Sequence, residues 1–350
     1  MESKNELIDI AKGIGIILVV AGHCMEFPKN YIYLFHMPLF FFLSGYCYKE
    51  KYNQNLSNIF ILLKKRIKSL YFPFVKYGLL FVLLHNFFYD IYVYSMPELW
   101  SHNKMTYFFC VQDWIKAIIG ILTFSRLEQM LNPFWFLPAL FIVTMLFAFI
   151  SYITKFLKYE DLMKAIFIYF YFLFACFFNT DENKLLRIIT ISSLGLLSFY
   201  LGFLYKKYIK QKIYSYRIAF LCILILVSNS IYGHINVSNF EFSSPGFYII
   251  SSLSGIYLVL FFSNVSSNFP IKNFLKYLGN ITIEIMALHY ISFKLVSWII
   301  INYYILPENY LGYPTLFYGT IWDLFYCIIG IILPVILINV FKIKDYIFRG

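Results

Sequence analysis

Residues 134–154 read FWFLPALFIVTMLFAFISYIT, an apolar run without a charged side chain. An α-helix of about 20 apolar residues spans the hydrocarbon core of a bilayer. Nine further apolar runs lie at 8–27, 31–48, 70–94, 165–178, 188–205, 217–233, 247–263, 278–302 and 316–341. The sequence therefore predicts an all-α polytopic membrane protein with a bundle of about ten transmembrane helices. We expect one membrane domain over residues 1–350 and no separate soluble domain.

The composition excludes other classes of protein. Of the 350 residues, 61% are hydrophobic and only 13% are charged, and the mean hydropathy is +0.69. A soluble domain carries about 25% charged residues, so this chain cannot cover the surface of a water-soluble globule. Disorder is excluded because apolar residues are too abundant. A membrane β-barrel would need segments of alternating hydrophobicity instead of continuous apolar runs.

The net charge of +11 is explained by topology and not by nucleic-acid binding. With the N-terminus in the cytoplasm, 20 of the 29 Lys and Arg residues fall in inside segments and three fall within spans. The outside segments hold only Lys29, Lys104, Lys116, Arg126, Lys184 and Arg187. Loops rich in Lys and Arg stay in the cytoplasm, so both termini are predicted to be cytoplasmic. We expect a lipid bilayer around the protein and no nucleic-acid partner.

The first span carries a stripe of ionisable residues. Lys12 and His23 are eleven residues apart, which on a helix brings them to within about 20° of one face and about 16 Å apart along the axis. Asp9 is one turn from Lys12, and Glu26 is predicted to lie one turn beyond His23. Charged groups inside a membrane are costly and usually functional. Two other interpretations are that Lys12 snorkels to the interface and that His23 is an ordinary interfacial residue.

The second span begins with Leu34-Phe35-His36-Met37-Pro38, and Pro38 is predicted to interrupt the helix there. Only a short loop separates the first two spans, so His36 is expected at the same outer level as His23. Imidazole titrates near neutrality, so two such histidines suit a general base with a supporting group. The alternative is a single interfacial histidine beside a kink.

Two other regions have a recognisable pattern, a basic cluster and a long outside loop. A basic cluster precedes the third span and suits either anionic lipid or the phosphates of a cytosolic cofactor; it consists of Lys64, Lys65, Arg66 and Lys68. The largest outside loop, 95–133, is predicted to contain a short helix, either lying in the outer interface or packing on the bundle.

His85 and Asp90 match an HxxxxD motif, but on a helix they diverge by about 140° and do not form a pair.

Four segments resemble the integral-membrane acyltransferase family 3, most closely its branch of fucose 4-O-acetylase-like and exopolysaccharide O-acyltransferases. The first segment is Ile8-Asp9-Ile10-Ala11-Lys12-Gly13-Ile14-Gly15, continuing to Gly22-His23. The second is Leu34-Phe35-His36-Met37-Pro38-Leu39-Phe40-Phe41 with Ser44-Gly45. Weaker matches are Asn132-Pro133-Phe134-Trp135-Phe136-Leu137 and Leu278-Gly279 through Leu288-His289. Many members carry arginine at the position of Lys12. They also carry two arginines three residues apart in the basic cluster, where this chain has Arg66 followed by Ser69 while Lys65 and Lys68 keep the spacing.

The resemblance implies transfer of an acyl group, most simply acetyl, from cytosolic acetyl-CoA or another acyl-CoA to a glycan hydroxyl. The glycan would be extracytoplasmic or lipid-linked, such as a capsule, O-antigen or exopolysaccharide, and the protein would lie in a bacterial inner membrane. The catalytic set expected on this basis, with His23 as general base, is His23, Lys12, His36 and Glu26. The donor-binding set is Lys12, Asp9, Lys64, Lys65, Arg66 and Lys68, and the acceptor-binding set is Trp135, Glu284 and His289.

Two rival functions remain open. A transporter or flippase of lipid-linked saccharides is also polytopic with buried charge. A membrane-bound O-acyltransferase acting on lipid or protein would use a histidine within the membrane, and His289 fits that role, although the first-span motif does not support it. The six cysteines form no CxxC pair, so we expect no metal site. The sequence makes no prediction of the oligomeric state.

Overall fold

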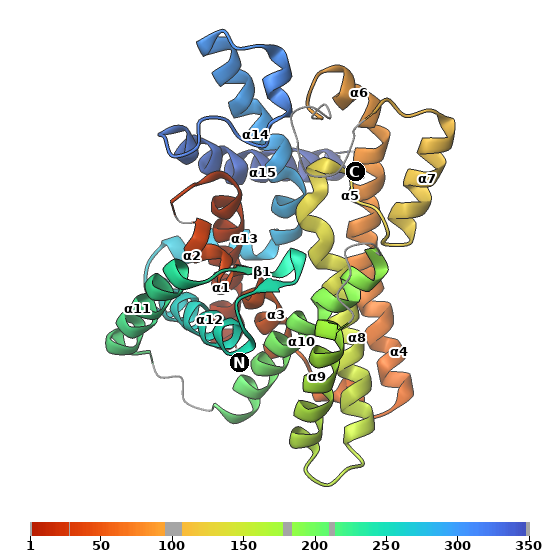
Figure 1. The fold of residues 1–350 in the computed structure, drawn as a ribbon, viewed down its shortest axis with the longest axis vertical. Coiled ribbons are helices and arrows are strands. Elements are labelled where there is room, and N and C mark those ends of the chain that lie inside the picture. Colours follow the sequence, from red (N-terminus) through yellow and green to blue (C-terminus); the bar gives the residue numbers. More distant parts are fainter. Residues whose placement is uncertain (1, 28, 95–106, 178–183, 210–213, 348–350) are drawn as a thin grey trace. The chain divides into compact units, whose positions relative to one another are not determined.

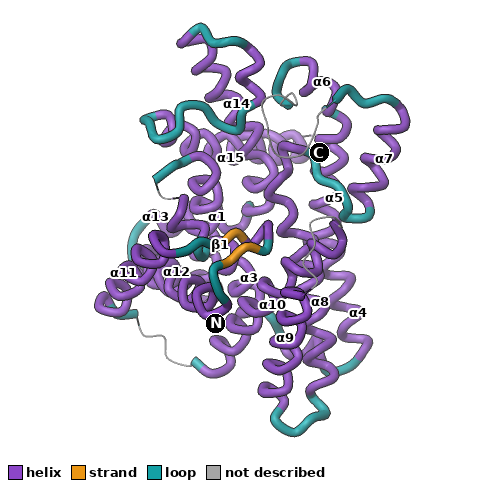
Figure 2. Tube along the Cα trace, viewed as in Figure 1, coloured by secondary structure: helices purple, strands orange, loops and turns teal. Residues whose placement is uncertain are grey.

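The computed structural model describes residues 2–27, 29–94, 107–177, 184–209 and 214–347. Within these ranges nearly all of the regular structure is helical (Figures 1 and 2). The strands found there, β1 (Ile235–Asn236) and β2 (Glu241–Phe242), form a short antiparallel pair. The predicted all-α class is confirmed.

The α-helices follow one another with short connections. They are α1 (Glu2–Cys24), α2 (Lys29–Tyr33), α3 (His36–Tyr46), α4 (Leu56–Arg66), α5 (Phe72–Leu83), α6 (His85–Asp90), α7 (Val111–Leu122), α8 (Phe136–Thr154), α9 (Glu160–Phe177), α10 (Lys184–Tyr208), α11 (Tyr216–Tyr232), α12 (Pro245–Ser266), α13 (Ile271–Asn280), α14 (Thr282–Tyr304) and α15 (Trp322–Ile347). A π-helical turn, η2 (Ile67–Tyr71), joins α4 to α5, and 3₁₀ turns are η1 (Glu50–Asn53), η4 (Gln129–Trp135), η5 (Val237–Asn239) and η6 (Glu308–Gly312).

Six of the described helical segments are long and apolar enough to cross a membrane. They are Glu6–Cys24, Gln129–Thr154, Arg187–Tyr208, Pro245–Ser266, Thr282–Tyr304 and Trp322–Val340. The chain is therefore a multi-pass membrane protein. The other four predicted spans coincide with α3, α5, α9 and α11, which are shorter or more polar. A count of ten spans and the cytoplasmic termini stay predictions.

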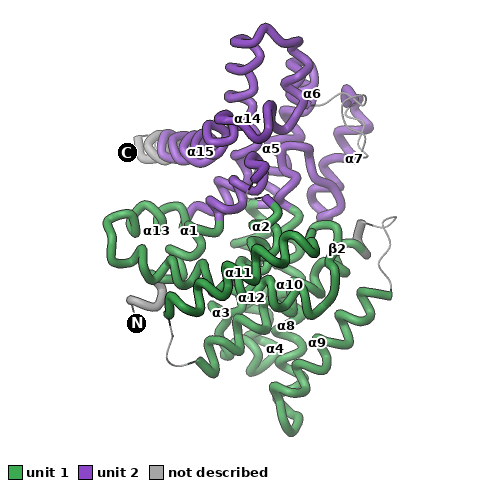
Figure 3. The backbone as a smooth tube through the Cα atoms, turned by 60° about the vertical axis from the view of Figure 1, so that its left-hand side comes forward, with its two compact units in different colours: residues 1–15, 30–73, 135–280 green, residues 16–29, 74–134, 281–350 purple. Residues whose placement is uncertain are grey.

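The chain divides into two compact units (Figure 3). Unit 1 contains residues 1–15, 30–73 and 135–280, and unit 2 contains residues 16–29, 74–134 and 281–350. Helix α1 contributes its first part to unit 1 and its last part to unit 2. The expectation of a single membrane domain stays a prediction.

Helices α3 and α10 meet through glycines in unit 1. A Cβ at Gly45 would collide with the backbone carbonyl of Phe199, and a Cβ at Gly202 would collide with that of Phe42. Small residues let helix backbones approach closely inside a membrane, where dispersion contacts replace the hydrophobic effect as the driving force. The glycines therefore fix the distance between these two helices.

The first part of α1 is attached to α13 in the same way. Side chains added at Gly13 or Gly279 would collide with the carbonyls of Leu275 and Asp9, respectively. Close to this contact, the ammonium group of Lys276 lies 3.2 Å from the carboxylate of Glu6. The backbone around Asp9 and Lys12 is thus held against α13 at short range.

In unit 2, α14 packs against α15. The hydroxyls of Ser297 and Tyr326 form a buried hydrogen bond of 2.7 Å, and the rings of Phe293 and Tyr326 are 5.6 Å apart. A Cβ at Gly330 would meet the Phe293 ring and Val20. The end of α1 is therefore packed in this core with α14 and α15.

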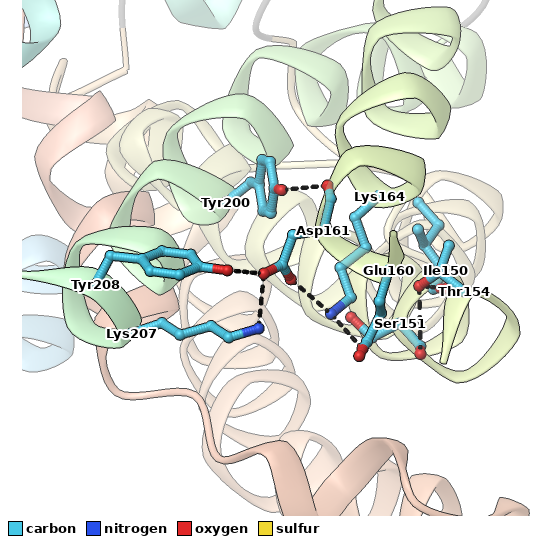
Figure 4. A network of polar contacts seen from close by, with 9 residues as sticks. All are labelled: Ile150, Ser151, Thr154, Glu160, Asp161, Lys164, Tyr200, Lys207 and Tyr208. Atoms are coloured by element: carbon cyan, nitrogen blue, oxygen red, sulfur yellow. Dashed lines mark hydrogen bonds and ion pairs between the residues drawn. The ribbon is translucent and has the colours of Figure 1, made fainter. Parts of the chain in front are cut away.

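A polar network fastens α9 to α10 (Figure 4). The carboxylate of Asp161 accepts hydrogen bonds from Lys207, at 2.7 Å, and from Tyr208, while its backbone carbonyl accepts one from Tyr200 at 2.6 Å. Burial raises the pKa of the Asp161 carboxyl, but the bonds from Lys207 and Tyr208 outweigh burial and hold this pKa below its ordinary value. The ionised form of Asp161 therefore stabilises the folded state.

Replacing Asp161 with asparagine is expected to destabilise the fold at pH 7 by about 1 kcal/mol, because half-exposed ion pairs contribute little each. A carboxyl whose pKa is depressed by folding stabilises above its unfolded pKa and loses this effect as the pH falls through the folded value. The gap in unfolding temperature between wild type and Asp161→Asn should therefore close in acid. The control is Asp90→Asn, which removes an exposed carboxylate. A gap independent of pH would contradict the assignment.

Two local predictions about the first two spans are wrong. Helix α1 ends at Cys24, so Glu26 does not lie on a further helical turn. Pro28 follows shortly afterwards, and helical backbone geometry is disfavoured for the residue that precedes a proline. The break after α2 lies at Leu34 and Phe35, and Pro38 sits in the first turn of α3. Proline is tolerated there because first-turn N–H groups have no partner within the helix.

The short helix predicted in the loop 95–133 is confirmed as α7; residues 95–106 lie outside the described residues. Asp113 accepts a hydrogen bond from the backbone N–H of Cys110 at the helix start, and hydrogen bonds from Cys110 lower the pKa of its carboxyl. Ala117 and Gly120 face inward, while apolar side chains along the helix remain exposed: Val111, Ile115, Ile118, Ile119 and Leu122. A location in the membrane interface stays a prediction.

Candidate active site

His23 lies at the end of α1, where α14 supplies two ring side chains. Nδ1 of His23 is 3.1 Å from the hydroxyl oxygen of Tyr290. The His289 ring stacks on the His23 ring, with centroids 5.4 Å apart and planes inclined by 27°. All three residues belong to unit 2. Consecutive positions on α14 thus contact the edge and the face of the same imidazole.

His289 is fully buried, and its two ring nitrogens differ. Nδ1 donates to the carbonyl of Ile285, one turn earlier on α14, at 3.1 Å. Nε2 has no hydrogen-bond partner among the described residues. A buried nitrogen with an open lone pair is costly unless a ligand satisfies it. The atom suits a hydroxyl that donates a hydrogen bond.

The chain following α1 is tied to the start of α15. The backbone N–H groups of Glu26 and Gly319 both donate to one carboxylate oxygen of Asp323, each at 3.1 Å. The side chain of Glu26 is exposed. In this arrangement Glu26 contributes its backbone to the support of the His23 region.

Lys12 and Asp9 form an ion pair of 2.9 Å in unit 1, as their one-turn spacing predicts. Lys12, Lys206 and Arg66 all lie within electrostatic range of the Cys47 thiol. Lys206 also donates to the backbone carbonyl of Tyr48 at 2.8 Å. Unit 1 therefore concentrates cations from α1, α4 and α10 near the end of α3.

Arg66 differs from the lysines around it. It precedes the π-helical turn η2, and its Nε and the Oγ of Ser69 are buried without hydrogen-bond partners among the described residues. Burial lowers the pKa of the Arg66 guanidinium. Single π-helical turns are frequent at functional sites. Two buried donors without acceptors at such a turn suit an anionic ligand.

The rest of the basic cluster faces outward. Lys64, Lys65 and Lys68 are exposed. The ammonium of Lys64 lies 4.8 Å from the ring centroid of Phe60, and that of Lys65 lies 5.9 Å from that of Tyr52. The structure thus separates one half-buried arginine from three exposed lysines, a distinction that the sequence does not make.

Three further residues predicted for the site are His36, Trp135 and Glu284. His36 is buried, and its Nδ1 donates to the carbonyl of Ile32 at 2.9 Å. Trp135, at the end of η4, is half-buried beside Phe136. Glu284 is half-buried in the first turn of α14. His36 and Trp135 belong to unit 1, and Glu284 belongs to unit 2.

Sequence reasoning missed Tyr290, Lys206 and Ser69 as site residues. Tyr290 directly follows the His289 motif, which was the available signal for it. His85 does not pair with Asp90; it is buried and contacts Glu128 at 2.8 Å. Its other ring nitrogen lies 3.0 Å from the backbone carbonyl of Tyr107. Both ring nitrogens of His85 therefore contact other parts of the chain, and neither is left for a substrate.

Comparisons with known proteins bear on the whole chain. Curated proteins and solved structures gave no match. A family model described as an acyltransferase domain, Acyl_transf_3, matches residues 5–339, which include nearly all of α1, the whole of α14 and every candidate site residue. The match covers far more than half of the chain. The protein therefore belongs to the integral-membrane acyltransferase family 3.

Proposed function

We propose that this membrane acyltransferase moves an acyl group, most simply acetyl, from acyl-CoA to a glycan hydroxyl, with His23 as general base. The observation that carries the proposal is the contact of His23 with Tyr290 and with the buried His289. An imidazole held at its edge and its face is oriented for proton transfer. The open lone pair of His289 Nε2 suits a second hydroxyl of the glycan, because the reacting hydroxyl gives its only proton to His23.

The donor is proposed to bind in unit 1. Acyl-CoA carries phosphates and an activated thioester. Arg66 and Ser69 have buried donors that suit phosphate oxygens, and the exposed lysines of the cluster add attraction for the same charge. Lys12, held by Asp9, adds a further cation that suits the negatively charged part of acyl-CoA.

The proposed reaction is a single transfer. The acceptor hydroxyl loses its proton to Nε2 of His23 while its oxygen forms the ester bond at the acyl carbon. The carbon–sulfur bond of the thioester breaks, and the departing sulfur takes the proton from Nε2, which yields the free CoA thiol. One base is therefore regenerated in each cycle.

The proposed setting is a bacterial inner membrane with both termini in the cytoplasm. The support is the distribution of Lys and Arg between the two sides of the predicted spans. Acyl-CoA would then reach Lys12 from the cytoplasm, and His23, later on α1, would face an extracytoplasmic or lipid-linked glycan. Capsule, O-antigen and exopolysaccharide are the candidate acceptors.

The decisive experiment uses purified protein in nanodiscs with radiolabelled acetyl-CoA and the glycan fraction of a bacterial cell envelope. We expect glycan-dependent release of the CoA thiol and label in the glycan. Label in lipid or protein instead would favour the membrane-bound O-acyltransferase alternative. Translocation of a lipid-linked saccharide without thioester cleavage would identify a transporter and overturn the proposal.

Replacing Lys12 with methionine is expected to weaken binding of acetyl-CoA about tenfold, equivalent to about 1.4 kcal/mol, because one cation of the donor site is lost. Lys12→Arg should retain binding, since it keeps the charge and adds bidentate contacts. Calorimetric titration with acetyl-CoA measures both. Lys116→Met, which removes an exposed lysine on α7, serves as the control. Unchanged affinity in Lys12→Met would place the donor elsewhere.

A further inference from the structure

Tyr290 has a specific relation to the ring of His23. Its hydroxyl oxygen lies 3.1 Å from Nδ1, and its ring centroid is 5.2 Å from that of His23. The Tyr290 ring also packs against Phe293, with centroids 5.7 Å apart. The phenol is thus held by its own helix while its oxygen meets one ring nitrogen of His23.

The direction of this hydrogen bond decides whether His23 can act as a base. If Nδ1 carries the proton and donates to the phenolic oxygen, Nε2 has a lone pair and can accept a proton. If the phenol donates to Nδ1, Nε2 carries the proton and cannot accept another. Acyl transfer through Nε2 therefore requires the first arrangement.

We propose that Tyr290 is a positioning residue that accepts the Nδ1 proton of His23 and thereby keeps Nε2 as the basic nitrogen. This inference rests on the function proposed for His23. The same bond persists after proton transfer, because the imidazolium retains its Nδ1 proton. A hydrogen bond that involves a charged partner is about twice as strong as a neutral one, so the contact favours the protonated intermediate state of the base.

The stacked His289 supports this arrangement. Its Nδ1 proton is committed to the carbonyl of Ile285, and protonation of the buried Nε2 would create an N–H without an acceptor among the described residues. His289 therefore stays neutral. A neutral ring on the face of His23 restricts its rotation and places no second positive charge beside the imidazolium.

The test compares Tyr290→Phe, which keeps the ring and removes the oxygen, with wild type. We expect kcat for CoA thiol release from acetyl-CoA to fall about 10- to 100-fold, the size of effect found when the partner that orients a metal-binding histidine is lost, with KM for acetyl-CoA nearly unchanged. Diethyl pyrocarbonate modification of His23, followed by mass spectrometry between about pH 5 and pH 8, gives a second readout that needs no activity. In Tyr290→Phe the midpoint of this pH profile should move to lower pH, because the His23 imidazolium has lost the phenolic oxygen that accepts its Nδ1 proton.

Tyr303→Phe is the matched control, since it removes a hydroxyl from an exposed position of the same helix and should alter neither readout. Equal unfolding temperatures for wild type and Tyr290→Phe establish that folding is intact. Wild-type kcat and an unshifted modification profile in Tyr290→Phe would overturn the role of Tyr290, even if His23→Gln is inactive. Full activity of His23→Gln would instead overturn the proposed function, while the modification profile would still report on the Tyr290 contact.

Discussion

His23→Gln is expected to lower acyl transfer by about a hundred- to ten-thousandfold, the usual contribution of a positioned general base. Glutamine has a similar size and can still hydrogen bond to Tyr290, but its amide cannot accept a proton at neutral pH. The variant should therefore insert, fold and bind acetyl-CoA as wild type does. The measurements are CoA thiol release by the purified protein and the acyl content of the glycan.

The control for this prediction is His234→Gln, the same chemical change at an exposed position between α11 and β1. It should retain wild-type activity. Activity of His23→Gln within a few fold of wild type would remove His23 from the chemistry. His289 would then be the next histidine to test, since it is buried beside the same ring.

Gly202→Ala is expected to destabilise the protein by about 2–3 kcal/mol, the upper part of the range found for overpacked cores. The added Cβ would collide with the backbone carbonyl of Phe42 on α3, and a helix backbone cannot move aside as a flexible side chain can. The helices α3 and α10 would have to separate, which breaks their contacts along the crossing. Thermal unfolding in nanodiscs measures the loss.

The matched control has the opposite expected sign. Gly246, in the first turn of α12, has no atom within 4 Å of an added Cβ. Gly246→Ala should therefore be neutral or stabilise by up to about 1 kcal/mol, because alanine is the better helix former. Equal effects of the two substitutions would contradict the close crossing of α3 and α10.

Much of the fold follows from local sequence. An apolar run without charges, such as that in α8, has to satisfy its backbone hydrogen bonds internally in a bilayer, and only a helix does so within one segment. The short helix α7 is equally local, and in the structure Asp113 accepts the backbone N–H of Cys110 at its start. These predictions needed no knowledge of the neighbouring helices, and they were confirmed.

Local helix boundaries were harder to predict. Apolar residues run across Leu34 and Phe35, so hydropathy gave no signal of that break, while Met25 and Phe27 carried the predicted first span past Cys24. Pro38 was predicted to interrupt its helix, but it occupies the first turn, where its missing N–H costs nothing. The position of a proline within a helix depends on where the helix begins, and no side-chain cap marks the start of α3.

The sequence by itself determined that this is a helical membrane protein, that Lys12 and His23 share one helix, and that its motifs resemble those of acyltransferases. These properties depend on residues near one another in the chain. Only the tertiary structure decided that Tyr290 contacts His23, that Lys206 joins Lys12 near Cys47, and that Arg66 alone of its cluster turns inward. Such contacts join residues up to 267 positions apart, and helical periodicity describes each helix without saying which face meets which partner.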